Sequence, residues 1–221
     1  MKKIINIIIL IVSILLFGLV IITGLIPGFI LDTKIMLGCL FFPIIISFIT
    51  MVIEIKISKN YEEKEILKIF WLRILFILYC LALFAVLFLD SEYRLLVTLY
   101  NKNVFSKEHL STINIIPFKS LIDFFSNWNI KILILNIGVN LILFMPMGFF
   151  IPILFKNKIG NIKKFTLIMI IVTVIIEILQ FLTYRGSTDI DDVILNVFGA
   201  ILAYLFVKSR IGTKLLQKIL D

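Results

Sequence analysis

Charged residues are scarce in this sequence of 221 residues, and several long runs contain none at all. Hydrophobic residues make up 61% of the chain and its mean hydropathy is +1.14. An ordinary soluble domain is only about 45–50% apolar. The core of a soluble protein of this length could not bury that excess. The composition therefore excludes an ordinary soluble domain and predicts a protein whose solvent is lipid.

Side chains that bind metals or form disulfides are also scarce. The single histidine, His109, cannot supply a His-rich metal site, and we expect it in a solvated loop. Cys39 and Cys80 each lie inside an apolar run without a CxxC partner, which predicts free core thiols. The HExxH, P-loop and GxSxG patterns are missing. These absences exclude the catalytic classes that those motifs mark, and a histidine-dependent lipid phosphatase with them.

Apolar runs of membrane-spanning length are abundant. About 20 apolar residues in a helix cross a hydrocarbon core about 30 Å thick. Six runs approach or exceed this length, at residues 4–26, 35–53, 69–89, 132–154, 165–183 and 190–207. Between them we expect a charged, solvated loop with some helical character from Glu54 to Lys68, with Trp71 and Arg73 at the membrane interface. The sequence predicts an all-α, polytopic membrane bundle of about six helices.

Basic residues are distributed unequally between the two sides of such a bundle. The net charge is +8, but the lysines and arginines form short clusters without the stripe or aromatic motif of a nucleic-acid binder. Six spans place fifteen basic residues on the side of both termini and seven on the other. The positive-inside rule then predicts cytoplasmic termini, with loop 90–131 and the turn before Asp189 outside the cell.

Polar residues interrupt the last three spans at similar depths below the outer surface. Glu177 and Gln180 share one helical face, and so do Asp189, Asp192 and Asn196. Asn140 lies at a comparable depth in the fourth span, and Arg185 lies in the outer turn. We expect these spans to meet along their polar faces and to form an outward-facing polar pocket. Ionisable groups inside a membrane usually mark a functional site.

Two other interpretations of these residues remain open. The polar groups could serve only as hydrogen bonds between helices, most plausibly for Asp191, which faces away from the Asp189–Asp192 face, towards the interface. Alternatively, Glu177, Asp189 and Asp192 could hold a divalent cation such as Mg²⁺ or Ca²⁺, ions that prefer oxygen ligands. That would suit an intramembrane enzyme acting on a lipid-linked phosphate or ester. We favour a non-enzymatic protein without a cofactor.

Four motifs in order resemble the VanZ-like family of bacterial membrane proteins. They are Asn114-Ile-Ile-Pro-Phe118, then Asn140-Leu-Ile-Leu-Phe-Met-Pro-Met-Gly148 with Pro152, then Glu177-x-x-Gln180 with Arg185, and Asp189-Ile-Asp-Asp-Val-Ile-Leu-Asn-Val-Phe-Gly-Ala200. The resemblance covers residues 72–207. It divides the chain into an extension at 1–68, a VanZ-like membrane domain at 69–207 and a basic cytoplasmic tail at 208–221, which is weakly amphipathic.

The resemblance implies a link to the cell envelope of a Gram-positive bacterium. The family's namesake is associated with low-level resistance to teicoplanin-type glycopeptide antibiotics. We therefore expect the pocket to bind an amphiphile, namely a lipid headgroup, a lipid-linked cell-wall precursor or a lipoglycopeptide. The candidate binding residues are Asn114, Asn140, Glu177, Gln180, Arg185, Asp189, Asp192 and Asn196.

Overall fold

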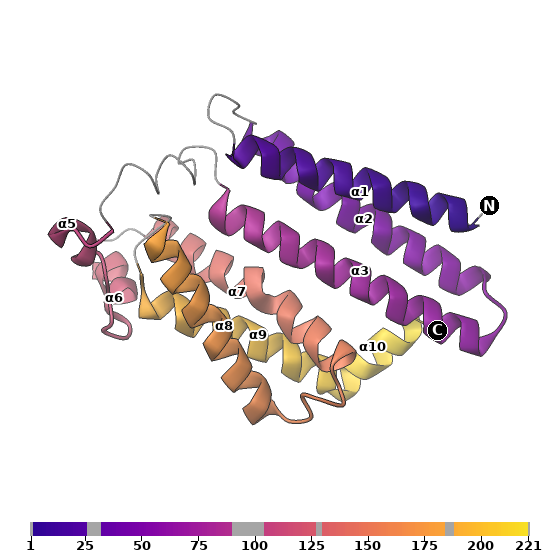
Figure 1. The fold of residues 1–221 in the computed structure, drawn as a ribbon. Helices are drawn as coiled ribbons and strands as arrows, with labels where there is room; N and C mark the ends of the chain where they lie inside the picture. The colour runs from indigo at the N-terminus through magenta and orange to yellow at the C-terminus, as the bar shows by residue number, and fades with distance from the viewer. Residues whose placement is uncertain (1, 26–31, 90–103, 127–129, 184–187, 221) are drawn as a thin grey trace. The chain divides into compact units, whose positions relative to one another are not determined.

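The computed structural model of the protein describes residues 2–25, 32–89, 104–126, 130–183 and 188–220. Its helices are α1 (Lys2–Leu25), α2 (Thr33–Ile57), α3 (Tyr61–Phe88), α5 (Lys107–Leu110), α6 (Lys119–Ser126), α7 (Ile130–Leu154), α8 (Ile162–Leu182), α9 (Ile190–Lys208) and α10 (Arg210–Leu220) (Figure 1). Within the described ranges, β-pairing is limited to one isolated parallel bridge between Asn114 and Asp189.

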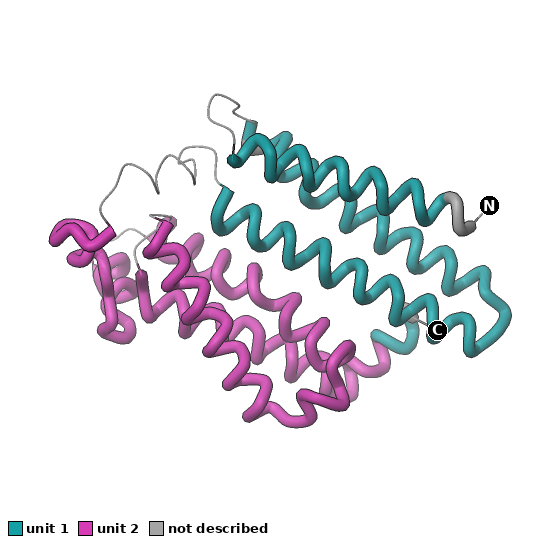
Figure 2. Tube along the Cα trace, viewed as in Figure 1, with its two compact units in different colours: residues 1–101, 216–221 teal, residues 102–215 magenta. Residues whose placement is uncertain are grey.

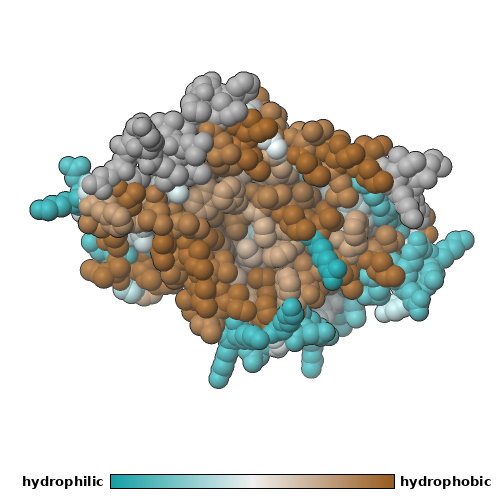
Figure 3. All heavy atoms as spheres, viewed as in Figure 1, coloured by the Kyte–Doolittle hydropathy of each residue, from teal (hydrophilic) through white to brown (hydrophobic). Residues whose placement is uncertain are grey.

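Six of these helices, α1, α2, α3, α7, α8 and α9, are long and apolar enough to cross a membrane. Their exposed positions are largely isoleucine, leucine and phenylalanine, such as Ile14 at 70% and Ile142 at 67% exposure. Figure 3 shows apolar surface over the long helices, with hydrophilic residues gathered mainly in patches. Such helices bury their backbone polar groups internally and can face lipid on the outside. The predicted all-α bundle of about six spans is confirmed.

The chain forms two compact units, residues 1–101 with 216–221 and residues 102–215 (Figure 2). The first holds α1, α2 and α3, which pack around an apolar cluster that includes Phe17, Leu40 and Ala82. The second holds the helices from α5 to α9 and the beginning of α10. The residues of the four sequence motifs all belong to the second unit, apart from Arg185, which lies outside the described residues.

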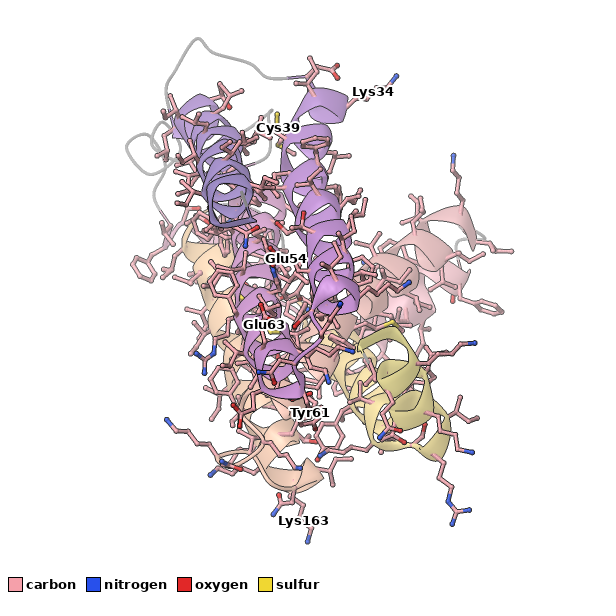
Figure 4. All side chains as sticks on the ribbon, turned by 90° about the vertical axis from the view of Figure 1, so that its right-hand side faces the viewer. Lys34, Cys39, Glu54, Tyr61, Glu63 and Lys163 are labelled. Atoms are coloured by element: carbon pink, nitrogen blue, oxygen red, sulfur yellow. The ribbon has the colours of Figure 1, made fainter. Side chains whose placement is uncertain are left out.

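The charged segment at residues 54–68 is helical on both sides of a short connection at 58–60, so its expected helical character is confirmed and the expected long loop is wrong. Helix α2 continues to Ile57, and α3 begins at Tyr61, where the Asn60 side chain caps its first turn by accepting from the backbone N–H of Glu62. The charges of this segment favour a solvated loop, but the Glu54 side chain is buried. Figure 4 shows Glu54 facing inward among the helices of the first unit, whereas Lys34 at the start of α2 points away.

Two hydrogen bonds inside the first unit compensate for the burial of the Glu54 carboxylate in α2. Glu54 accepts a hydrogen bond of 2.7 Å from the indole Nε1 of Trp71 and one of 2.9 Å from Nδ2 of Asn6. The helices α1, α2 and α3 thus each contribute one side chain to this hydrogen-bonded set. The Trp71 side chain is fully buried and its ring N–H is committed to Glu54, and its expected depth at the membrane interface stays a prediction.

In the second unit, α9 contacts both α7 and α8, and it packs most closely against α7. Two glycines permit that approach. A Cβ built on Gly148 of α7 would lie 2.0 Å from the Ala200 carbonyl oxygen, and one built on Gly199 of α9 would lie 2.3 Å from that of Leu141. Helix α7 stays continuous although it contains Pro146 and Pro152. A glycine on each helix therefore allows α7 and α9 to come into backbone contact.

Candidate functional site: a polar group beneath a clamped loop

The site begins at Asp189, the residue that caps the N-terminus of α9. Its carboxylate accepts from the backbone N–H of Asp191 at 3.0 Å, which is the usual bond of an N-cap aspartate. The same carboxylate also accepts from Nδ2 of Asn114 at 2.9 Å and from the hydroxyl of Ser120. Backbone bonds between Asn114 and the residues flanking Asp189 complete the parallel bridge. Asp189 therefore fastens the Asn114–Phe118 motif to the start of α9.

Asp191 makes a second connection to the same segment. Its side chain is only 1% exposed, and its two oxygens accept from the backbone N–H groups of Phe118 and, at 3.3 Å, of Leu121. These N–H groups belong to the start of α6, where they have no partner inside the helix. The expectation that Asp191 faces the interface is wrong. The sequence gives no sign that α6 folds back beside the first turns of α9 (Figure 1).

Phe118 adopts the backbone conformation that this second connection requires. Its φ is +65°, which is uncommon for a residue with a side chain. The residue follows Pro117 and precedes the first residue of α6. Strained backbone of this kind persists where surrounding contacts enforce it. We call the group Asn114, Ser120, Asp189 and Asp191 the loop clamp, since these side chains hold the segment from Asn114 to Leu121.

A second set of polar residues lies deeper, on the facing sides of α7, α8 and α9. We call Asn140, Glu177, Asp192 and Asn196 the inner polar group. Asp192 accepts a hydrogen bond of 2.5 Å from Nδ2 of Asn140, and Asn136 lies beside the same carboxylate. Glu177 accepts from the backbone N–H of Asp189 at 3.3 Å. It lies within electrostatic range of Asp192, so α7, α8 and α9 converge here.

Asn196 differs from the other members because part of its side chain has no partner. The residue is 3% exposed and its Oδ1 forms no hydrogen bond with any described residue. It lies one turn beyond Asp192 on the same face of α9. A buried carbonyl without a donor costs about 1–3 kcal/mol. Such a group within a partly satisfied polar cluster points to a missing hydrogen-bond donor.

The structure thus brings together six of the eight sequence candidates in two connected sets. Asn114 and Asp189 lie in the loop clamp, and Asn140, Glu177, Asp192 and Asn196 form the inner polar group. Gln180 is half-buried one turn from Glu177 on α8. Arg185 lies outside the described residues. Whether these residues bind a ligand, and whether they line a pocket, stays a prediction.

The expectation that His109 is a solvated loop residue is wrong. His109 is buried on α5, its ring stacks on Phe181 at a centroid distance of 4.3 Å, and its Nε2 lies 2.9 Å from the Phe181 carbonyl oxygen. This contact fastens α5 to the end of α8, whereas the loop clamp fastens the following segment to the start of α9. His109 and Phe181 are 72 residues apart, and a single histidine forms no sequence pattern that could have predicted this contact.

The metal set Glu177, Asp189 and Asp192 also stays a prediction. Three hydrogen bonds already engage both oxygens of Asp189. Within the part of the chain that the structure describes, no group of three or more histidine, cysteine, aspartate or glutamate side chains is arranged to hold a metal ion. The described contacts therefore assign Asp189 to the loop clamp.

Comparisons with known proteins match the part of the chain that holds these two sets. The VanZ/LLP1 family model matches residues 76–212, which is well over half of the chain. Protein VanZ of Enterococcus faecium is 40% identical over 63 residues, a stretch that covers 28% of this chain and 38% of that relative's length. No solved structure matches the chain. All described members of the loop clamp and the inner polar group fall inside the matched region.

Proposed function

Because the chain belongs to the VanZ/LLP1 family and is a multi-pass membrane protein, we propose that it binds an amphiphile at the inner polar group, from the outer side of the cell membrane. Both termini are then cytoplasmic, since the positive-inside rule favours the side with more basic residues. In this orientation α5, α6 and the first turn of α9 face the cell exterior. The ligand is a lipid headgroup, a lipid-linked cell-wall precursor or a lipoglycopeptide.

The observation that carries this proposal is the incomplete pairing of the inner polar group. Glu177 and Asn196 are buried, yet Asn196 has an acceptor without a donor. If the group served only to join helices, its members would satisfy one another, because half-satisfied networks are unfavourable in a low-dielectric interior. A bound headgroup would supply the missing donor.

The loop clamp supports an amphiphile rather than a wholly polar ligand. It holds an apolar segment beside the start of α9, and the large side chains of that segment are exposed at Ile115, Ile116, Phe118, Ile122 and Phe125. An amphipathic segment of this kind lies in a membrane interface with its apolar side towards acyl chains. A ligand with a polar head and an apolar tail would therefore meet both surfaces.

Analysis of the lipids that co-purify with the protein tests this function. We compare wild type with the Glu177→Gln/Asp192→Asn variant, and we use Glu108→Gln/Asp123→Asn as the matched control because both of its carboxylates are exposed. After detergent exchange, mass spectrometry should find a retained amphiphile in wild type and in the control but not in the variant. Equal retention by a folded variant would contradict the proposal.

Drug susceptibility tests whether the ligand is connected with teicoplanin resistance. We expect expression of the wild-type chain to reduce susceptibility to teicoplanin, which has a lipid tail, more than to vancomycin, which has none. Asp192→Asn should abolish the difference at an unchanged expression level, whereas Asp123→Asn should preserve it. Identical susceptibility in all strains would separate this chain from a resistance role.

A further inference from the structure

We propose that the headgroup bound by the inner polar group presents a primary ammonium, so that the ligand is an amine-bearing amphiphile. This inference rests on the proposed function and adds the chemistry of the ligand. It follows from the kinds of atoms that the group leaves available, their burial and their charge.

The buried atoms without a described partner include an acceptor, and two further acceptor groups carry negative charge when ionised. Asp192 receives its described hydrogen bonds from amides, and only one Glu177 oxygen accepts from a backbone N–H. Asn196 adds the unpartnered Oδ1. Carboxylates and carbonyls accept hydrogen bonds, whereas a phosphate or sulfate offers acceptors of its own. A phosphate alone would therefore leave the Asn196 Oδ1 without a donor and would face two carboxylates to which it donates no bond.

The negative charges of Glu177 and Asp192 also favour a ligand with an ammonium group. Glu177 and Asp192 lie within electrostatic range of each other. Among the described residues, no lysine or arginine forms an ion pair with either of them. Two neighbouring carboxylates in a low-dielectric region need a nearby cation before both can ionise favourably. A cationic headgroup would fill that role, whereas an anionic headgroup would add repulsion.

The number of donors favours an alkylammonium over a metal ion or a quaternary amine. A primary ammonium has three N–H donors, and the inner polar group offers two carboxyl groups and the unpartnered carbonyl of Asn196. Mg²⁺ and Ca²⁺ take about six or more oxygen ligands, and the described residues provide no three acidic side chains arranged for a metal. A quaternary amine has no N–H donor for Asn196.

Binding of defined lipids to the purified full chain tests the headgroup chemistry. The probes are dioleoylphosphatidylethanolamine, its N-acetyl derivative and dioleoylphosphatidylglycerol, each titrated in detergent and counted by native mass spectrometry. We expect the amine-bearing lipid to bind at least about tenfold more tightly than the other two, because acetylation removes a charge-assisted hydrogen bond. Glu177→Gln/Asp192→Asn should remove the preference, and Glu108→Gln/Asp123→Asn should keep it.

The outcomes separate this inference from the proposed function. Equal binding of all three lipids that is still lost in the Glu177→Gln/Asp192→Asn variant would overturn the ammonium and leave an amphiphile site. Binding unchanged by that variant would overturn both. If the double variant does not fold, the same lipid titrations with Asp192→Asn alone replace it. This single variant should fold, because Asp192 is only half-buried and asparagine has the same shape.

The alternative to a cationic ligand is a cation from the protein itself. Arg185 is the one arginine close in sequence to Glu177 and Asp192. An Arg185→Gln variant should retain the preference for the amine-bearing lipid if the headgroup is the cation. If Arg185 is itself the counter-ion, this variant should instead show a new requirement for the amine, with little preference in wild type. That second pattern would overturn the inference.

Discussion

At the scale of single residues, Asp191 stabilises contacts with residues 73 and 70 positions away in the sequence. Its oxygens accept from Phe118 and Leu121, whose N–H groups would otherwise be unpaired at the start of α6. We expect Asp191→Ala to lower the free energy of unfolding by about 1–3 kcal/mol, because buried donors lose their acceptor. The matched control is Asp123→Ala at an exposed position of α6.

Hydrogen exchange locates this effect within the molecule. Amides of α6 should exchange faster in Asp191→Ala than in wild type, whereas amides of α1 to α3 should be unchanged, because the loop clamp belongs entirely to the other compact unit. Unchanged exchange in α6, measured in a variant with normal helical content, would show that Asp191 does not hold this segment.

The Glu54–Trp71 bond offers a second prediction for single residues. Trp71→Phe keeps a large aromatic side chain but removes the Nε1–H that binds Glu54 at 2.7 Å. We expect a loss of about 1–3 kcal/mol, since the buried carboxylate loses a donor. Combining it with Glu54→Leu should cost less than the sum of the two single changes, as measured by thermal unfolding in detergent. Additive effects would contradict the coupling.

At the scale of elements, glycine decides how closely α7 and α9 approach. We expect Gly199→Ala to destabilise the second unit by about 1–3 kcal/mol, because its Cβ would overlap the Leu141 backbone. Gly138→Ala is the matched control, since a Cβ there meets no atom within 4 Å and alanine favours a helix. Thermal unfolding of the two variants in the same detergent distinguishes them. Equal melting temperatures would contradict close packing.

The elements also show what sequence patterns can and cannot predict. Long apolar runs define the spans directly, so the six long helices were predicted with end shifts of a few residues, apart from α3, which begins at Tyr61 rather than at residue 69. The polar faces of α8 and α9 were predicted because helical spacing is fixed by geometry. Glu54, His109 and Asp191 were misassigned, since each is buried against a partner in another, distant segment of the chain. Local composition contains no information about such partners, and polar residues are exposed in most contexts.

At the scale of the whole molecule, the orientation across the membrane can be tested with cysteines. After replacement of Cys39 and Cys80 by alanine, we expect Ser126→Cys to react with a membrane-impermeant maleimide in intact cells. Lys158→Cys, between α7 and α8, should react only after permeabilisation. These two positions lie at opposite ends of α7. The reverse pattern would place the loop clamp in the cytoplasm and contradict the proposed outer-side site.

The measurement that tests the central claim most directly is the reaction of a cysteine beside the inner polar group with charged thiol reagents. Gln180→Cys, in the same cysteine-free background, lies one turn from Glu177 and is half-buried. Both reagents are added outside intact cells. A trimethylammonium methanethiosulfonate should react with this cysteine several times faster than the sulfonate analogue, because the negative potential of the inner polar group concentrates cations. Glu177→Gln/Asp192→Asn should remove the difference. Faster reaction of the sulfonate reagent, or no reaction from outside, would contradict an outward-facing acidic site.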